Sequence, residues 1–64
     1  MNSTEVHATT EAMLRYGGRF FQSLATTIRY ADNENRERIF LAFPKILSEY
    51  GPQSKFYATT EEQQ

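Results

Sequence analysis

The sequence predicts an all-α protein built as a helical hairpin. Apolar residues recur at the three- and four-residue spacing of an α-helix in two stretches, and a polar run, Asp32 to Asn35, separates them. A Gly51-Pro52 pair then stops the second stretch. We therefore expect two main helices, over about 4 or 10 to 31 and over about 34–50, joined by one short loop.

The first helix has two possible starts. Ser3 or Thr4 supplies an N-terminal cap with Glu5 in the first turn, whereas a start near Thr9 or Thr10 places Glu11 just inside the helix. At about 100° per residue the apolar residues after this point share one arc. They are Met13, Tyr16, Phe20, Phe21, Leu24, Ile28 and Ala31.

Gly17 and Gly18 lie inside the first helical stretch, and the apolar residues keep helical phase on both sides of the pair. We therefore predict that one continuous helix runs through both glycines. Gly17 lies near the middle of the apolar arc, so another helix is expected to approach it closely, whereas Gly18 lies nearer the edge. Gly17→Leu should then disrupt packing, and Gly18→Ala should be neutral or stabilising.

The second helix begins near Asn33 to Asn35 and presents one apolar face. Pro44 interrupts it, because proline lacks the backbone donor and its ring collides with the carbonyl of Phe40. Since the apolar face keeps its phase across Pro44, we expect a kinked but nearly continuous helix; the alternative is a short helix to Ala42 and a new one from Pro44. Gly51 is expected to end the helix as a left-handed cap. The apolar face comprises Ile39, Phe40, Phe43, Ile46, Leu47 and Tyr50.

After Gly51 the pattern is polar, with one apolar pair, Phe56-Tyr57. The sequence therefore predicts a single small helical domain over 1–57 and a disordered polar tail over 58–64.

The first helix has an apolar arc of about 180°, which is wider than one neighbouring helix covers. A second copy of the chain would cover the remainder in a symmetric four-helix dimer. The alternative is a monomer in which the C-terminal segment folds back and Phe56-Tyr57 covers the gap. The residues expected to pack or self-associate are Leu14, Gly17, Phe21, Leu24 and Ile28.

Composition limits the chemistry that this chain can perform. With no cysteine and the single histidine His7 among 64 residues, the sequence offers neither a disulfide nor a recognisable metal cluster, and we expect no cofactor. No nucleophile and base pair can be named, so an enzyme is the least favoured class; it would need Glu37 or Glu49 to meet His7 across a dimer. The sequence shows no membrane-spanning run and no secretory signal, and we expect a cytoplasmic protein.

Cationic residues form a stripe opposite the apolar arc of the first helix. Arginine binds carboxylates and phosphates through two parallel hydrogen bonds, so this stripe is a candidate partner-binding face. A solvated face is the simpler interpretation, and Glu11 with Arg15 fits an ordinary i,i+4 pair. With the second helix included, the candidate face comprises Arg15, Arg19, Gln22, Arg29, Arg36 and Arg38.

We expect this protein to bind another protein, as an inhibitor or adaptor that docks a helical surface on a larger host complex. Its small size is common among phage and mobile-element proteins of that kind. Nucleic-acid binding through the arginine face is the alternative, although a net charge of −1 does not favour it.

Overall fold

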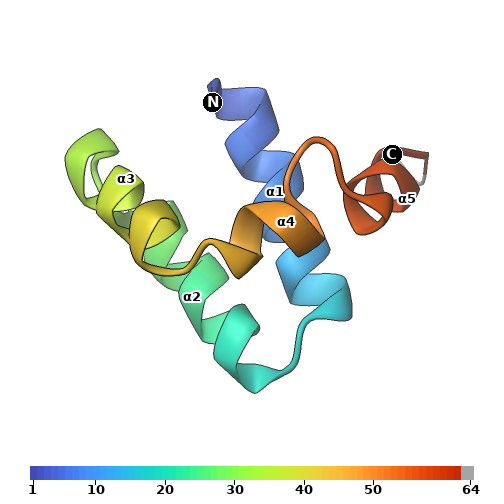
Figure 1. Cartoon of the computed structure of the whole chain (residues 1–64), viewed down its shortest axis with the longest axis horizontal. Helices are drawn as coiled ribbons and strands as arrows, with labels where there is room; N and C mark the ends of the chain where they lie inside the picture. The colour runs from blue at the N-terminus through green and yellow to red at the C-terminus, as the bar shows by residue number, and fades with distance from the viewer. Residues whose placement is uncertain (63–64) are drawn as a thin grey trace.

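The computed structural model describes residues 1–62 and confirms the all-α prediction: this part of the chain forms helices and no strand. In Figure 1, α1 runs through the middle of the molecule, α2 and α3 lie on one side of it, α5 lies on the other, and α4 crosses it. The helices are α1 (Ser3–Tyr16), α2 (Arg19–Tyr30), α3 (Asn33–Ala42), α4 (Lys45–Tyr50) and α5 (Lys55–Glu62). The predicted hairpin of two long helices is therefore replaced by five shorter ones.

Helix α1 takes the earlier of its two expected starts, and Asn2 caps it. The Asn2 side chain accepts a hydrogen bond from the Glu5 amide at 2.8 Å, and the Glu5 carboxylate accepts one from the Asn2 amide at 3.1 Å. This reciprocal capping box satisfies two amides that the helix itself leaves without partners. Helix α1 is then buried on several sides, because α2, α4 and α5 all pack against it. Its buried residues are Val6, Ala8, Thr9, Thr10, Ala12 and Met13.

The predicted continuous helix through Gly17 and Gly18 is wrong, because the chain breaks there. Gly17 ends α1 with an extended backbone, and its amide donates to the Met13 carbonyl at 2.9 Å; Gly18, also extended, precedes α2. Two successive glycines cost a helix about 2 kcal/mol relative to alanine. The break lets α2 fold back along α1, so both apolar stripes face the same core. The apolar residues before and after the glycines therefore keep the same helical phase although they belong to two separate helices.

The chain also breaks at Pro44, as in the alternative that the sequence left open. Helix α3, capped by the Asp32 side chain, ends at Ala42, and α4 begins at Lys45 after Phe43 leaves helical geometry. The favoured kinked helix is wrong, because proline cannot donate to the Phe40 carbonyl. The predicted left-handed cap at Gly51 is wrong as well, since Gly51 has φ −75° and ψ 179°.

Part of the predicted disordered tail is helical. Helix α5 extends to Glu62 and packs across α1 and α4, whereas residues 63–64 lie outside the described part. The Phe56 ring stacks on Tyr16 with centroids 4.7 Å apart and on Tyr50 at 5.7 Å, and Tyr57 is buried. The proposed covering of α1 by Phe56-Tyr57 is therefore observed. The sequence offered little indication of α5, because Phe56, Tyr57 and Thr60 are its main packing residues and the rest of the segment is largely polar.

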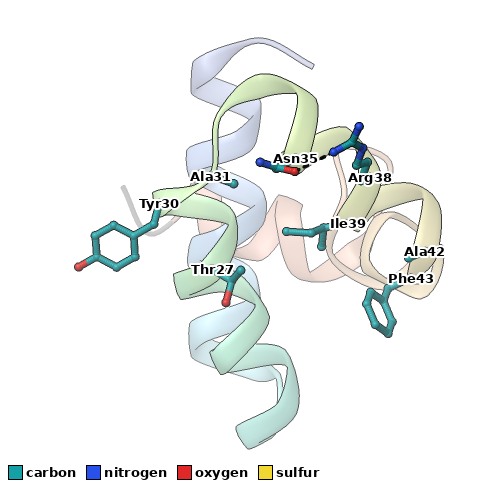
Figure 2. Close-up of a pocket in the computed structure, with 8 residues that line it drawn as sticks. All are labelled: Thr27, Tyr30, Ala31, Asn35, Arg38, Ile39, Ala42 and Phe43. Carbon is teal, nitrogen blue, oxygen red and sulfur yellow. Dashed lines mark hydrogen bonds between the residues drawn. The ribbon is translucent and has the colours of Figure 1, made fainter.

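Helices α2 and α3 are loosely joined. They meet at the turn after Tyr30 and then diverge, as Figure 2 shows. On α3 only Phe40 is buried, while Ile39 is partly buried against the core. At the far end the rings of Phe20 and Phe43 meet edge to face with centroids 5.6 Å apart. The two helices therefore enclose a groove that is bounded at both ends.

Candidate functional site

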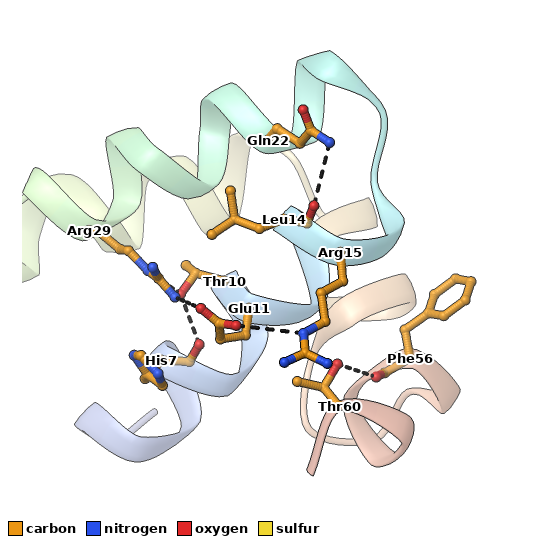
Figure 3. Close-up of polar contacts among 9 residues, drawn as sticks. All are labelled: His7, Thr10, Glu11, Leu14, Arg15, Gln22, Arg29, Phe56 and Thr60. Atoms are coloured by element: carbon orange, nitrogen blue, oxygen red, sulfur yellow. Dashed lines mark hydrogen bonds and ion pairs between the residues drawn. The ribbon is translucent and has the colours of Figure 1, made fainter. Parts of the chain in front are cut away.

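The predicted arginine face does not form one surface, because the break at Gly17-Gly18 places its members on separate helices. Arg15 of α1 and Arg29 of α2 instead converge on Glu11 (Figure 3). Arg29 Nη2 lies 2.9 Å from Glu11 Oε1, and Arg15 Nε lies 3.7 Å from Oε2. Arg29 Nε also donates to Thr10 Oγ1 at 2.9 Å. This cluster ties α1 to α2, which favours the structural role over the partner-binding role.

The charge of Glu11 contributes to stability. The hydrogen bond from Arg29 lowers the pKa of the Glu11 carboxyl below its ordinary value; partial burial opposes the shift, and the charges of Arg29, His7 and Arg15 add to it. A carboxyl with a lowered folded-state pKa stabilises the fold above its unfolded-state pKa, and this contribution is lost as the pH falls through the folded-state value.

We expect Glu11→Gln to lower the free energy of unfolding by about 1 kcal/mol at pH 7. Gln keeps the shape of the side chain and removes only the charge. The difference from the wild type should shrink as the pH falls from about 5 toward 3, and urea unfolding at several pH values measures it.

Glu34→Gln is the matched control for this experiment. Glu34 also accepts a hydrogen bond from an arginine Nη2, that of Arg38 at 2.7 Å, but both side chains are largely exposed. Its loss should change stability by no more than a few tenths of a kcal/mol. Equal effects at Glu11 and Glu34 would show that the Glu11 cluster does not join the helices.

The other residues of the predicted face lie apart from this cluster. Gln22 Nε2 donates to the carbonyls of Gly17 at 3.2 Å and Leu14 at 3.4 Å, so Gln22 caps the end of α1. Arg36 donates to the Asn33 side chain, and Arg38 pairs with Glu34 within α3. Arg19 is exposed at the start of α2. Of the six residues predicted for this face, the structure brings Arg15 and Arg29 together, on Glu11, and leaves the other four elsewhere.

The residues predicted to self-associate are covered within one chain. Ile28 is fully buried, Gly17 is buried, and the others are partly buried hydrophobics packed against the core cluster; these are Leu14, Phe21 and Leu24. The α4 and α5 helices supply the cover that the sequence assigned to a second chain. The reason given for a dimer therefore no longer applies to this face.

The residues weighed for catalysis do not converge. His7 is exposed on α1, and Glu49 pairs with Lys45 at 3.6 Å on α4. Glu37 lines a polar cavity of about 150 Å³ with Ser3, Asn33 and Arg36 at the start of α1 and α3. Within residues 1–62, no three acidic or histidine side chains are grouped as metal ligands.

A groove between α2 and α3 has a volume of about 610 Å³ (Figure 2). Its apolar lining comes from Ala31, Ile39, Ala42 and Phe43, and Thr27 projects into it from α2. Tyr30 lies at its rim on α2, is 88% exposed, and turns its ring away from the lining residues of α3 (Figure 2). The polar residues of the lining, Asn35 and Arg38, lie together on α3.

Exposed apolar side chains continue beyond the groove. Phe20 is 57% exposed where it meets Phe43, and Leu41 is 80% exposed on α3 outside the groove lining. The sequence contained part of this signal, because Tyr30 and Leu41 lie outside the apolar stripes of their helices. It could not show the groove, which exists only because α2 and α3 diverge.

No protein-family model, no characterised protein and no solved structure matches this chain. Within the described residues, no helix has the length and hydropathy needed to cross a bilayer. The candidate site of this structure is the α2/α3 groove.

Proposed function

We propose that this protein is a non-enzymatic binding protein that docks on another protein through the α2/α3 groove, as an adaptor or an inhibitor. The observation that carries this function is the apolar groove of about 610 Å³ with the exposed Tyr30 at its edge. Continuous apolar surface of this kind is typical of interaction sites, whereas single exposed apolar residues are ordinary.

The composition of the groove supports a protein partner. Tyrosine and phenylalanine are enriched at protein interfaces, and anchors of this kind carry much of the binding energy when a partner excludes water from them. Phe43, the residue that directly follows α3, supplies one such anchor, and Tyr30 at the end of α2 supplies another at the rim of the groove. The small side chains of Ala31 and Ala42 leave room between them for a partner's side chains.

Nucleic-acid binding is the less favoured function. Arg29 already pairs with the Glu11 carboxylate of its own chain, and Arg15 contributes to the same cluster. Phosphate binding would have to compete with these pairs and would weaken steeply with salt.

A matched pair of substitutions tests the proposed function. Thr27 and Thr26 are both exposed on α2, and each hydroxyl donates to the carbonyl four residues earlier, at 2.9 Å and 3.3 Å. Thr27 lines the groove, whereas Thr26 is not part of the lining. Thr27→Arg should therefore fill the groove, and Thr26→Arg should leave it open, with similar small effects on helix stability.

Partners are to be captured from lysate of the source cells with the wild type and both variants, and then purified and titrated calorimetrically. We expect one partner whose affinity falls about tenfold or more with Thr27→Arg and stays within about twofold with Thr26→Arg. An equal effect of the two variants would overturn the groove as the site. Retention that disappears on nuclease treatment would favour nucleic-acid binding instead.

A further inference from the structure

We propose, on the basis of the protein-binding function above, that the occupant of the α2/α3 groove is one amphipathic helix with an acidic side chain that pairs with Arg38. Three features of the groove support this occupant: its shape, its length and the charge on its lining.

The shape of the groove fits a helix. Two diverging helices form its walls, and a third helix packs between such walls by placing its side-chain ridges in their grooves. Among the described residues there is no strand, so the groove offers no sheet edge to which an extended peptide could add. Helix-in-groove binding is the recognition mode that suits two helical walls with an apolar lining.

The length of the groove sets the spacing of the anchors. On α3 the lining runs from Asn35 to Ala42, which is about 10 Å of helix at about 1.5 Å per residue, and Phe43 follows the end of the helix. A bound helix would therefore contact the groove over about two turns. Its apolar anchors would recur at i, i+3 or i+4, and i+7, facing Ala31, Ile39 and Ala42.

The charge on the lining selects the partner. Arg38 is the one charged residue among the described residues that line the groove. Its Nη1 donates to Asn35 at 3.2 Å and its Nη2 to Glu34 at 2.7 Å, which leaves other donors of the guanidinium available.

The pair within α3 does not prevent this role for Arg38. The side chains of Arg38 and Glu34 are 67% and 74% exposed, and exposed pairs of this kind are weak. A carboxylate on an apolar helix would meet Arg38 where the helix excludes water, and there a charge-assisted hydrogen bond is stronger. A basic helix would instead meet like charge.

The probe for this inference is a displayed library of helical peptides of about 18 residues, selected on the full-length wild type and counter-selected on Thr27→Arg. We expect the enriched peptides to share the apolar spacing and one Asp or Glu beside it. Changing that acidic residue to Lys should weaken binding to the wild type about tenfold, as measured by fluorescence anisotropy.

Charge reversal on the protein completes the test. Arg38→Glu should bind the Lys peptide better than the acidic one, and Arg38→Gln should lose most of the preference. Lys55→Glu is the control, because it makes the same charge change at an exposed site on α5, which is remote in sequence and outside the groove lining. Thermal melts by circular dichroism verify that each variant is folded.

Several results would overturn the inference. An unchanged preference in Arg38→Glu would remove Arg38 as the determinant, and the absence of any enriched helix would remove the helical occupant. If light scattering shows a dimer that Thr27→Arg dissociates, the occupant is a second copy of this chain. If Arg38→Glu keeps the preference, or if no helix is enriched, the proposed function still holds as long as a cellular partner loses affinity with Thr27→Arg. Failure of this inference can therefore be told apart from failure of the proposed function.

Discussion

Gly17→Ala is expected to destabilise the fold by about 2 kcal/mol or more, although it adds a single methyl group. A Cβ at Gly17 would lie 2.6 Å from the Met13 carbonyl oxygen and 2.7 Å from the Phe21 Cβ, with the Tyr50 hydroxyl at 3.4 Å. The two closest atoms belong to the backbone and to the root of a side chain, so neither can move aside by a rotamer change. The end of α1 or the start of α2 must shift instead. Such a shift disturbs the core, because Met13 belongs to it and Phe21 packs against it.

Urea unfolding followed by circular dichroism measures this effect. With an unfolding slope of about 1 kcal/mol/M for a small domain, the midpoint should fall by about 2 M. The native stability of a chain of this length is only about 3–10 kcal/mol, so the loss is a large share of it.

Gly18→Ala is the matched control, because the same methyl group is added one residue later. A Cβ at Gly18 meets nothing within 4 Å, and its backbone, with φ −74° and ψ −173°, is open to any residue. Alanine lowers the conformational entropy of the unfolded chain, which stabilises the fold, but it is a poorer N-cap than glycine. The two effects oppose each other, so the free energy of unfolding should change by no more than about 0.5 kcal/mol. Equal midpoints for the two variants would show that Gly17 is not closely packed.

Tyr57→Ala is expected to cost about 3 kcal/mol, because α5 is part of the core and not an appendage. Tyr57 is 8% exposed, and its neighbour Phe56 stacks on rings of both α1 and α4. Removal of the Tyr57 ring opens a cavity beneath α5 and weakens its hold on α1. Both the urea midpoint and the helical signal of the folded state should fall.

Lys55→Ala is the control for Tyr57→Ala. Lys55 is exposed at the first position of the same helix, and alanine is a good helix former there. Its midpoint should remain close to that of the wild type. If Tyr57→Ala also leaves the midpoint unchanged, α5 does not contribute to the core as described.

The sequence contained only part of the candidate site. It identified Arg38 as a member of a charged face, and it left Tyr30 outside the apolar arc of the first helix. It could not place them on one groove, because their positions depend on the angle between α2 and α3. The arginine face failed for a related reason: a wheel assigns residues to faces only while the helix is continuous, and the break after Gly17 ends that assignment.

The sequence by itself determined that the chain is helical and determined about half of the apolar residues that are buried. Apolar spacing follows from the 3.6-residue turn, which is a local property, and it correctly indicated Met13, Ile28, Phe40, Ile46 and Tyr50 as buried. Local chemistry also marked where a helix is weak, at Gly17-Gly18 and at Pro44, but the sequence prediction carried a helix through both places.

Only the tertiary structure decided what happens at those breaks. A helix that continues past Gly17-Gly18 and a helix that folds back there present the same apolar phase, and tertiary packing, in which α2 lies against α1, selects the second. The same packing orders α5, whose own sequence is polar, and covers the residues that the sequence assigned to a dimer. It also leaves α2 and α3 apart, so the groove is a consequence of packing between segments distant in sequence, which no local pattern records.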